Sequence, residues 1–134
     1  MTDRAEQERR LIESFVLPER QSRYLELLSK PKRRKDVTSA LSHFKHLDVR
    51  DAFQIPAASR LASGILALLK SKGAPDSCFV VSEAAEIDGK EVELGEALEF
   101  VFGRGIGTFL SCIPGRLAYF EDEDGNFLLE RKST

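Results

Sequence analysis

The chain has 134 residues, of which 42% are hydrophobic and 31% are charged, with a formal net charge of −2. This size and composition are typical of a soluble globular domain that folds without a disulfide or a metal. The sequence contains no run of roughly 20 apolar residues and no signal-peptide pattern, so we expect a cytoplasmic protein with no membrane segment. Cys78 and Cys112 are too few for a disulfide framework and are expected to be reduced.

Charge is divided unevenly along the chain. Residues 1–50 carry twelve Lys and Arg against eight Asp and Glu, whereas residues 51–134 carry eight against fourteen. The pI of 5.8 argues against a dedicated nucleic-acid-binding protein, although not for the first third of the chain. We expect a single domain, 1–134, in which a basic helical portion (1–50) and an acidic α+β portion (59–134) share the core.

Two helices are predicted at the start. The first spans residues 3–16, with Thr2 or Asp3 as the capping residue and an apolar cluster at its end. The second begins at Pro18, which suits the first turn of a helix, and ends before Pro31.

Two further helices are predicted before the middle of the chain. Asp36 would cap the third, whose buried face shows the i, i+3, i+4, i+7 spacing of Val37, Ala40, Leu41 and Phe44. Residues 47–58 have no period and are predicted to form a loop. The fourth helix is expected to start near Ser59 and to end at Gly73.

The second half changes to strand-like patterns. Residues 78–81 suggest a buried strand, and Asp88-Gly89 a tight turn. A helical stripe over 94–102 is closed by Gly103. Three strands joined by turns then form an antiparallel meander over 108–113, 116–121 and 126–130. The predicted fold class is therefore α+β, with a helical N-terminal portion of about four helices packed against a C-terminal antiparallel sheet that carries one further helix.

The densest feature is a run of five cations around Pro31, which would lie between the second and third helices: Lys30, Lys32, Arg33, Arg34 and Lys35. Adjacent cations repel one another, so such a run usually faces water or an anion. We expect it to bind an anionic partner, either an acidic protein or a nucleic acid. The alternative is neutralisation by Glu26, Asp36 or the acidic half. If Arg33 and Arg34 are paired within the chain, the run is a clamp between two parts of one domain.

His43 and His46 are the only histidines, and a helix would place both on one face. They are weak candidates for metal ligands, with Asp48 or Asp51 as an oxygen donor. The alternative is that both are polar residues beside the buried stripe of the third helix, because no Cys or third His lies nearby in the sequence. No cofactor is predicted.

Other patterns are poor evidence for catalysis. The glycines of residues 103–107 follow a helix and precede a strand, the reverse of the order in a nucleotide-binding loop. Cys112 could act as a nucleophile if Arg116 lowered its pKa, although strand alternation also allows it to be buried. The many carboxylates are explained by exposed helix faces and turns.

Three hypotheses follow. The first is a small soluble binding or regulatory protein that recognises an anionic partner through the basic run and has no catalytic activity of its own. The second is a nucleic-acid-binding protein, and the third an enzyme with a metal at His43 and His46. Independently, residues 127–129 are expected to form an exposed sheet edge, which would favour a homodimer.

Overall fold

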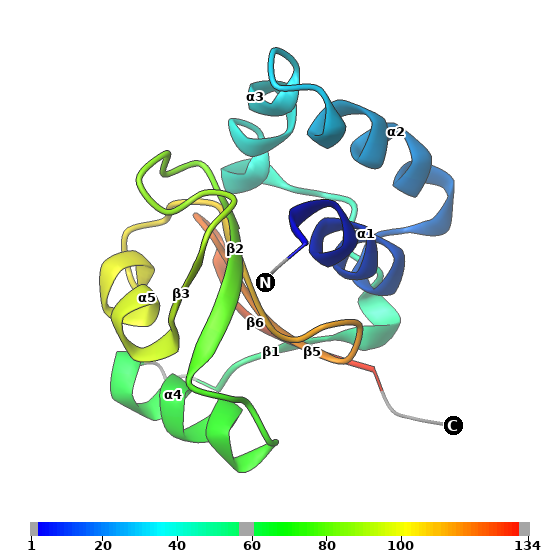
Figure 1. The fold of residues 1–134 in the computed structure, drawn as a ribbon. Coiled ribbons are helices and arrows are strands. Elements are labelled where there is room, and N and C mark those ends of the chain that lie inside the picture. The colour runs from blue at the N-terminus through cyan, green and yellow to red at the C-terminus, as the bar shows by residue number, and fades with distance from the viewer. Residues whose placement is uncertain (1–2, 57–60, 132–134) are drawn as a thin grey trace.

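An antiparallel sheet lies between two groups of helices in the computed structural model, which describes residues 3–56 and 61–131 (Figure 1). Within these ranges the helices are α1 (Arg4–Phe15), α2 (Pro18–Ser29), α3 (Arg34–Thr38), α4 (Ala62–Ser71) and α5 (Leu94–Val101). The strands are β1 (Ala52–Gln54), β2 (Ser77–Ser82), β3 (Glu91–Glu93), β4 (Thr108–Ile113), β5 (Leu117–Asp122) and β6 (Gly125–Glu130). Their order in the sheet is β1-β6-β5-β4-β2-β3. The α+β class is confirmed.

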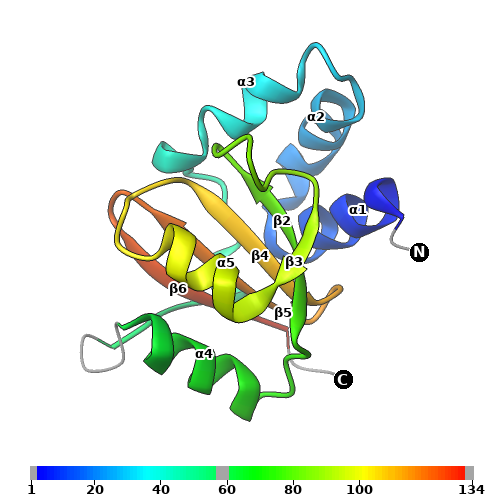
Figure 2. The same cartoon turned by 60° about the vertical axis from the view of Figure 1, so that its left-hand side comes forward.

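Each face of the sheet is covered by helices. Helices α1, α2 and α3 lie over one face, and α4 and α5 lie over the other (Figure 2). Side chains of a strand alternate between the faces: in β5, Ala118 and Phe120 join the cluster of α1–α3, whereas Leu117 and Tyr119 join that of α4 and α5. Both alternating sets are buried, which explains why the strand sequences show only partial polar alternation.

The first two helices form as predicted. The Asp3 side chain accepts hydrogen bonds from the backbone N–H groups of Ala5 and Glu6 and so caps α1. The apolar stripe at the end of α1 is buried, and Pro18 occupies the first turn of α2. Thr2, the other predicted cap, lies outside the described residues.

The predicted third helix is interrupted. Helix α3 has only five residues, and a single 3-10 turn (Leu41–His43) follows before the chain becomes extended. Phe44 leaves the helical path and packs edge-on against Phe109, with ring centroids 5.7 Å apart. The helical period was therefore correct for the buried residues but wrong for the length of the helix, because packing against the sheet directs the chain away from the helix axis.

Three further expectations are corrected. Residues 47–58 were predicted to be a loop, but β1 forms within them and pairs with β6. Residues 127–129 are therefore not a sheet edge, because β6 lies between β1 and β5. Helix α4 covers the opposite face from α1–α3, so the four helices do not form one N-terminal layer (Figure 1). Ser59, the predicted start of this helix, lies outside the described residues.

The remaining elements agree with the sequence. The meander forms as β4, β5 and β6, and α5 is the further helix beside it. Of the helices in the described ranges, none is sufficiently long and apolar to cross a bilayer. The proposed division at residues 50 and 59 stays a prediction.

Candidate functional site

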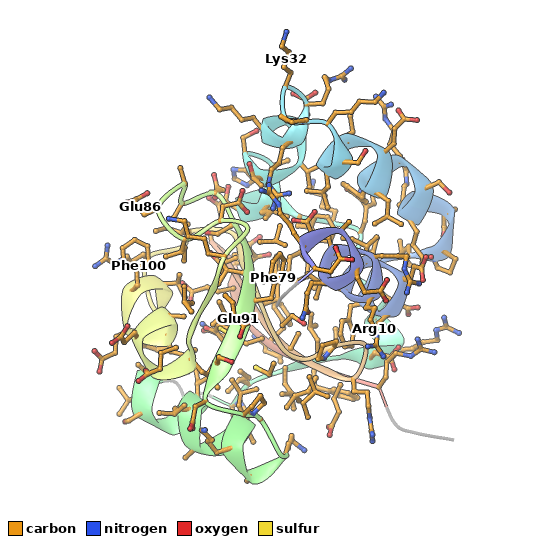
Figure 3. The ribbon with its side chains drawn as sticks, viewed as in Figure 1. Arg10, Lys32, Phe79, Glu86, Glu91 and Phe100 are labelled. Carbon is orange, nitrogen blue, oxygen red and sulfur yellow. The ribbon has the colours of Figure 1, made fainter. Side chains whose placement is uncertain are left out.

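The basic run forms the tight connection between α2 and α3 and the first two residues of α3, and we call residues 30–35 the basic turn. The Lys30 carbonyl accepts hydrogen bonds from the N–H groups of Arg33 and Arg34, both at 2.9 Å. These two bonds end α2 and direct the chain into α3. The turn lies at the periphery of the molecule, and Lys32 projects away from the rest of the protein (Figure 3).

Four of the five cations of the basic turn are exposed. Arg33 forms an ion pair with Asp36 in the next turn of the chain, 2.6 Å from Nε to Oδ2, and both side chains are half exposed. Within residues 3–56 and 61–131, the side chains of Lys30, Lys32 and Lys35 form no ion pair. The acidic second half of the chain therefore leaves the three lysines without a carboxylate partner in the part of the protein that the structure describes.

Arg34 is different, because its side chain is only 7% exposed. Its Nε lies 2.6 Å from Oδ2 of Asp88 and its Nη2 lies 3.0 Å from Oδ1, so the pair is bidentate. The same Nη2 lies 2.5 Å from Oε2 of Glu8, in an ion pair without the alignment of a hydrogen bond. We call these three residues the Arg34 cluster.

The Arg34 cluster joins three separate parts of the chain: α1, α3 and the loop between β2 and β3. Asp88 also accepts a hydrogen bond from the backbone N–H of Ser82 at 3.0 Å, which fixes the carboxylate in the loop. Burial by itself lowers the pKa of Arg34, but its interactions with Asp88 and Glu8 outweigh this effect and raise the pKa, so the guanidinium stays charged. Arg34, one member of the basic run, therefore holds α1, α3 and the β2–β3 loop together.

A surface hollow of about 350 Å³ lies next to the basic turn, between the start of α1 and the end of α2. We call it the α1–α2 hollow, and its lining residues are Arg4, Ala5, Glu8, Leu28, Ser29 and Pro31. Two of these residues connect it with the features above: Pro31 belongs to the basic turn, and Glu8 belongs to the Arg34 cluster. The basic turn, the Arg34 cluster and the α1–α2 hollow are therefore one continuous region.

The glycine-rich loop (residues 103–107) lies elsewhere, where α5 leads into β4. Its backbone N–H groups at Gly103 and Gly105 donate to the carboxylate of Glu121, at 3.3 and 3.1 Å. Tyr119 donates its hydroxyl to the same carboxylate at 2.8 Å, and Asn126 its amide at 3.1 Å. Burial raises the pKa of Glu121 despite these hydrogen bonds. The anion-binding groups of this loop are thus occupied by the protein's own side chain.

The two histidines have different partners. His43 Nδ1 lies 2.9 Å from a carboxylate oxygen of Glu123, whereas His46 Nδ1 lies 2.5 Å from the hydroxyl of Tyr24. The expectation that they share a helix face was wrong, because α3 ends at Thr38. Across the described residues, no three His, Cys, Asp or Glu side chains are grouped so that they could hold a metal ion.

Both cysteines are buried as free thiols in the core cluster beneath α4 and α5. Burial raises the pKa of Cys112 to about 12 and raises that of Cys78 as well. Arg116, the cation that the sequence suggested as an activator, is exposed and does not contribute to these shifts. The thiolate that a nucleophile requires is therefore disfavoured at both positions.

Sequence reasoning missed the partners of Arg34, although a signal was present. Glu8 precedes Leu11, Ile12 and Phe15 at the spacing of one helix face, and Arg34 precedes Val37, Thr38 and Leu41 at the same spacing. A charged residue at the head of a buried stripe needs a buried partner.

No family model, curated protein or solved structure matches the chain, so its function is argued from this geometry.

Proposed function

We propose that this chain is a binding protein that recognises an acidic protein segment through the basic turn. The observation that carries the proposal is that the three exposed lysines of the basic turn, Lys30, Lys32 and Lys35, have no carboxylate partner in the described residues, although the chain as a whole is acidic. Unpaired cations in such a position attract carboxylates from solution. The proposal requires no cofactor and places the protein in the cytoplasm, where buried thiols stay reduced.

Several features favour an acidic protein over a nucleic acid. The three unpaired lysines of the basic turn lie within six residues of a chain that is acidic overall, whereas a nucleic-acid backbone is usually bound by a stripe of Lys and Arg on a basic domain. Exposed Glu26 and Asp36 flank the turn on either side, and phosphates that extended beyond it would meet these charges. An acidic protein segment requires only a few carboxylates at the turn itself.

The Arg34 cluster supports this function by holding the basic turn in place. Its ion pairs attach the start of α3 to α1 and to the β2–β3 loop. The Lys30 carbonyl fixes the turn from its other side through two backbone hydrogen bonds. The lysine backbones are therefore ordered before binding, which lowers the entropy that association would otherwise cost.

The proposal is tested by fluorescence anisotropy with a labelled peptide rich in Asp and Glu. The intact chain should bind the peptide at low salt and release it as salt screens the charges. The triple variant K30E/K32E/K35E should lose binding by at least about ten-fold, since each reversal replaces an attraction with a repulsion. The control K45E/K90E/R116E makes the same change in net charge at exposed positions elsewhere and should bind as the native chain does.

Two outcomes would contradict the proposal. In the first, both triple variants lose the same affinity, which would mean that net charge alone is responsible. In the second, a DNA or RNA oligonucleotide binds and the peptide does not. About four phosphate contacts would then give a slope of roughly −3.6 for log K against log salt, and the nucleic-acid hypothesis would replace this one.

A further inference from the structure

We infer that the α1–α2 hollow binds an apolar side chain of the same acidic segment, so that the preferred partner is an acidic stretch with one leucine- or phenylalanine-sized residue. This inference rests on the proposed function and adds a second contact to it. It assigns the basic turn to the carboxylates and the α1–α2 hollow to the apolar residue.

Pro31 provides the geometric link between the two contacts. It lines the α1–α2 hollow, and its neighbours on either side are Lys30 and Lys32. A partner side chain in the hollow lies against Pro31, so the residues next to it in the partner lie beside one of the lysines.

The lining of the α1–α2 hollow suits an apolar group. Ala5 and Pro31 are exposed and Leu28 is buried, so together they offer apolar surface on both helices. The Glu8 carboxylate also lines the hollow, but it is 6% exposed and engaged by Arg34. A side chain that enters therefore does not meet a free carboxylate.

The charges around the α1–α2 hollow select the flanking residues of the partner. Arg4 is about half exposed, and its Nε lies 3.6 Å from Glu8, a distance that leaves this pairing weak. Lys30 and Lys32 are the chain neighbours of Pro31, which lines the hollow beyond the end of α2. An apolar centre with cations on two sides complements an apolar residue that has carboxylates on both sides.

The test compares two labelled peptides that differ at one position. Both are short and rich in Asp and Glu, one with a central leucine and the other with serine in its place. On the native chain the leucine peptide should bind about ten-fold more tightly, because partial burial of a leucine is worth about 1.4 kcal/mol. The difference should persist at high salt, since burial of apolar surface is not screened.

A filled hollow should remove this preference. Ala5 is exposed in the first turns of α1, so Ala5→Leu places a larger side chain into the α1–α2 hollow without disturbing the core. This variant should bind the two peptides equally, with the affinity that the native chain shows for the serine peptide. Ser22→Leu is the matched control, because it adds the same side chain at an exposed position of α2 that does not line the hollow, and it should keep the ten-fold preference.

The outcomes separate the inference from the proposed function. If the native chain binds the two peptides equally but K30E/K32E/K35E binds neither, the basic turn is a site and the hollow is not. If Ala5→Leu keeps the leucine preference, the apolar residue lies elsewhere and the inference is wrong. If neither peptide binds the native chain at low salt, the proposed function fails together with the inference.

Discussion

The basic turn and the glycine-rich loop are both suited to anions, and they differ in whether the chain supplies one. In the glycine-rich loop, the backbone N–H groups point at Glu121, a carboxylate of the protein itself. In the basic turn, three lysines have no partner in the described residues. The loop is therefore a structural feature of the fold, whereas the turn is available to another molecule.

Arg34 shows that the same difference exists among the cations of the basic turn itself. It follows the pattern of the glycine-rich loop, because Glu8 and Asp88 supply the carboxylates that it needs. Its neighbours in the sequence have the same charge but point outward. Charge density alone therefore does not identify a site, and what separates the two classes is whether the fold provides a counter-ion.

The largest expected effect on stability comes from removing the charge of Arg34. Arg34→Met leaves Glu8 and Asp88 without their counter-ion and should lower the free energy of unfolding by about 3–5 kcal/mol. Urea denaturation measures this loss. Arg33→Met, at the half-exposed neighbour, should change it by no more than about 1 kcal/mol. Equal effects of the two substitutions would show that the Arg34 cluster does not hold the fold together.

A smaller loss should follow from a side chain at the end of the glycine-rich loop. A Cβ at Gly107 would lie 2.2 Å from the carbonyl carbon of Leu41, so Gly107→Ala forces two backbone segments apart and should cost about 2–3 kcal/mol. At Gly103 a Cβ meets nothing within 4 Å, but the φ of +78° disfavours alanine by about 1–2 kcal/mol. Thermal unfolding of the two variants should preserve this order; the reverse order would contradict the close approach.

Glu121→Gln should change how stability depends on pH. Because burial raises the pKa of Glu121 above its ordinary 4.5, the folded protein holds this proton more tightly than the unfolded chain does. The stability that this gives is fully present below the ordinary pKa and is lost as pH rises through the raised value. The free energy of unfolding of the native chain, relative to Glu121→Gln, should therefore fall with rising pH. Denaturation of both proteins at a series of pH values measures this difference, and a difference that is constant with pH would contradict it.

The smallest effect on stability is expected at the exposed lysines. K30E/K32E/K35E should change the free energy of unfolding by no more than about 1 kcal/mol, because substitutions at exposed positions rarely cost more. The same variant should no longer bind the acidic peptide. Substitution of the lysines should therefore lower affinity without lowering stability, whereas substitution of Arg34 should lower both. A large loss of stability in this triple variant would show that the lysines have structural partners.

Local patterns predicted much of the fold. Pro18 and Asp3 marked the starts of α2 and α1, and the turn residues between β4, β5 and β6 marked the meander. These signals depend on a few neighbouring residues, so they are visible in the sequence. Strand β1 was missed because its three residues are specified by pairing with β6 and not by their own pattern.

The sequence by itself determined where positive charge is concentrated and which residues line the helix faces. Only the tertiary structure decided that Arg34 is internal and that Lys30, Lys32 and Lys35 are not. The physical reason is that a counter-ion is chosen by proximity in space, and Asp88 lies 54 residues from Arg34 along the chain. The fold brings that carboxylate to one cation of the run and leaves its neighbours facing water.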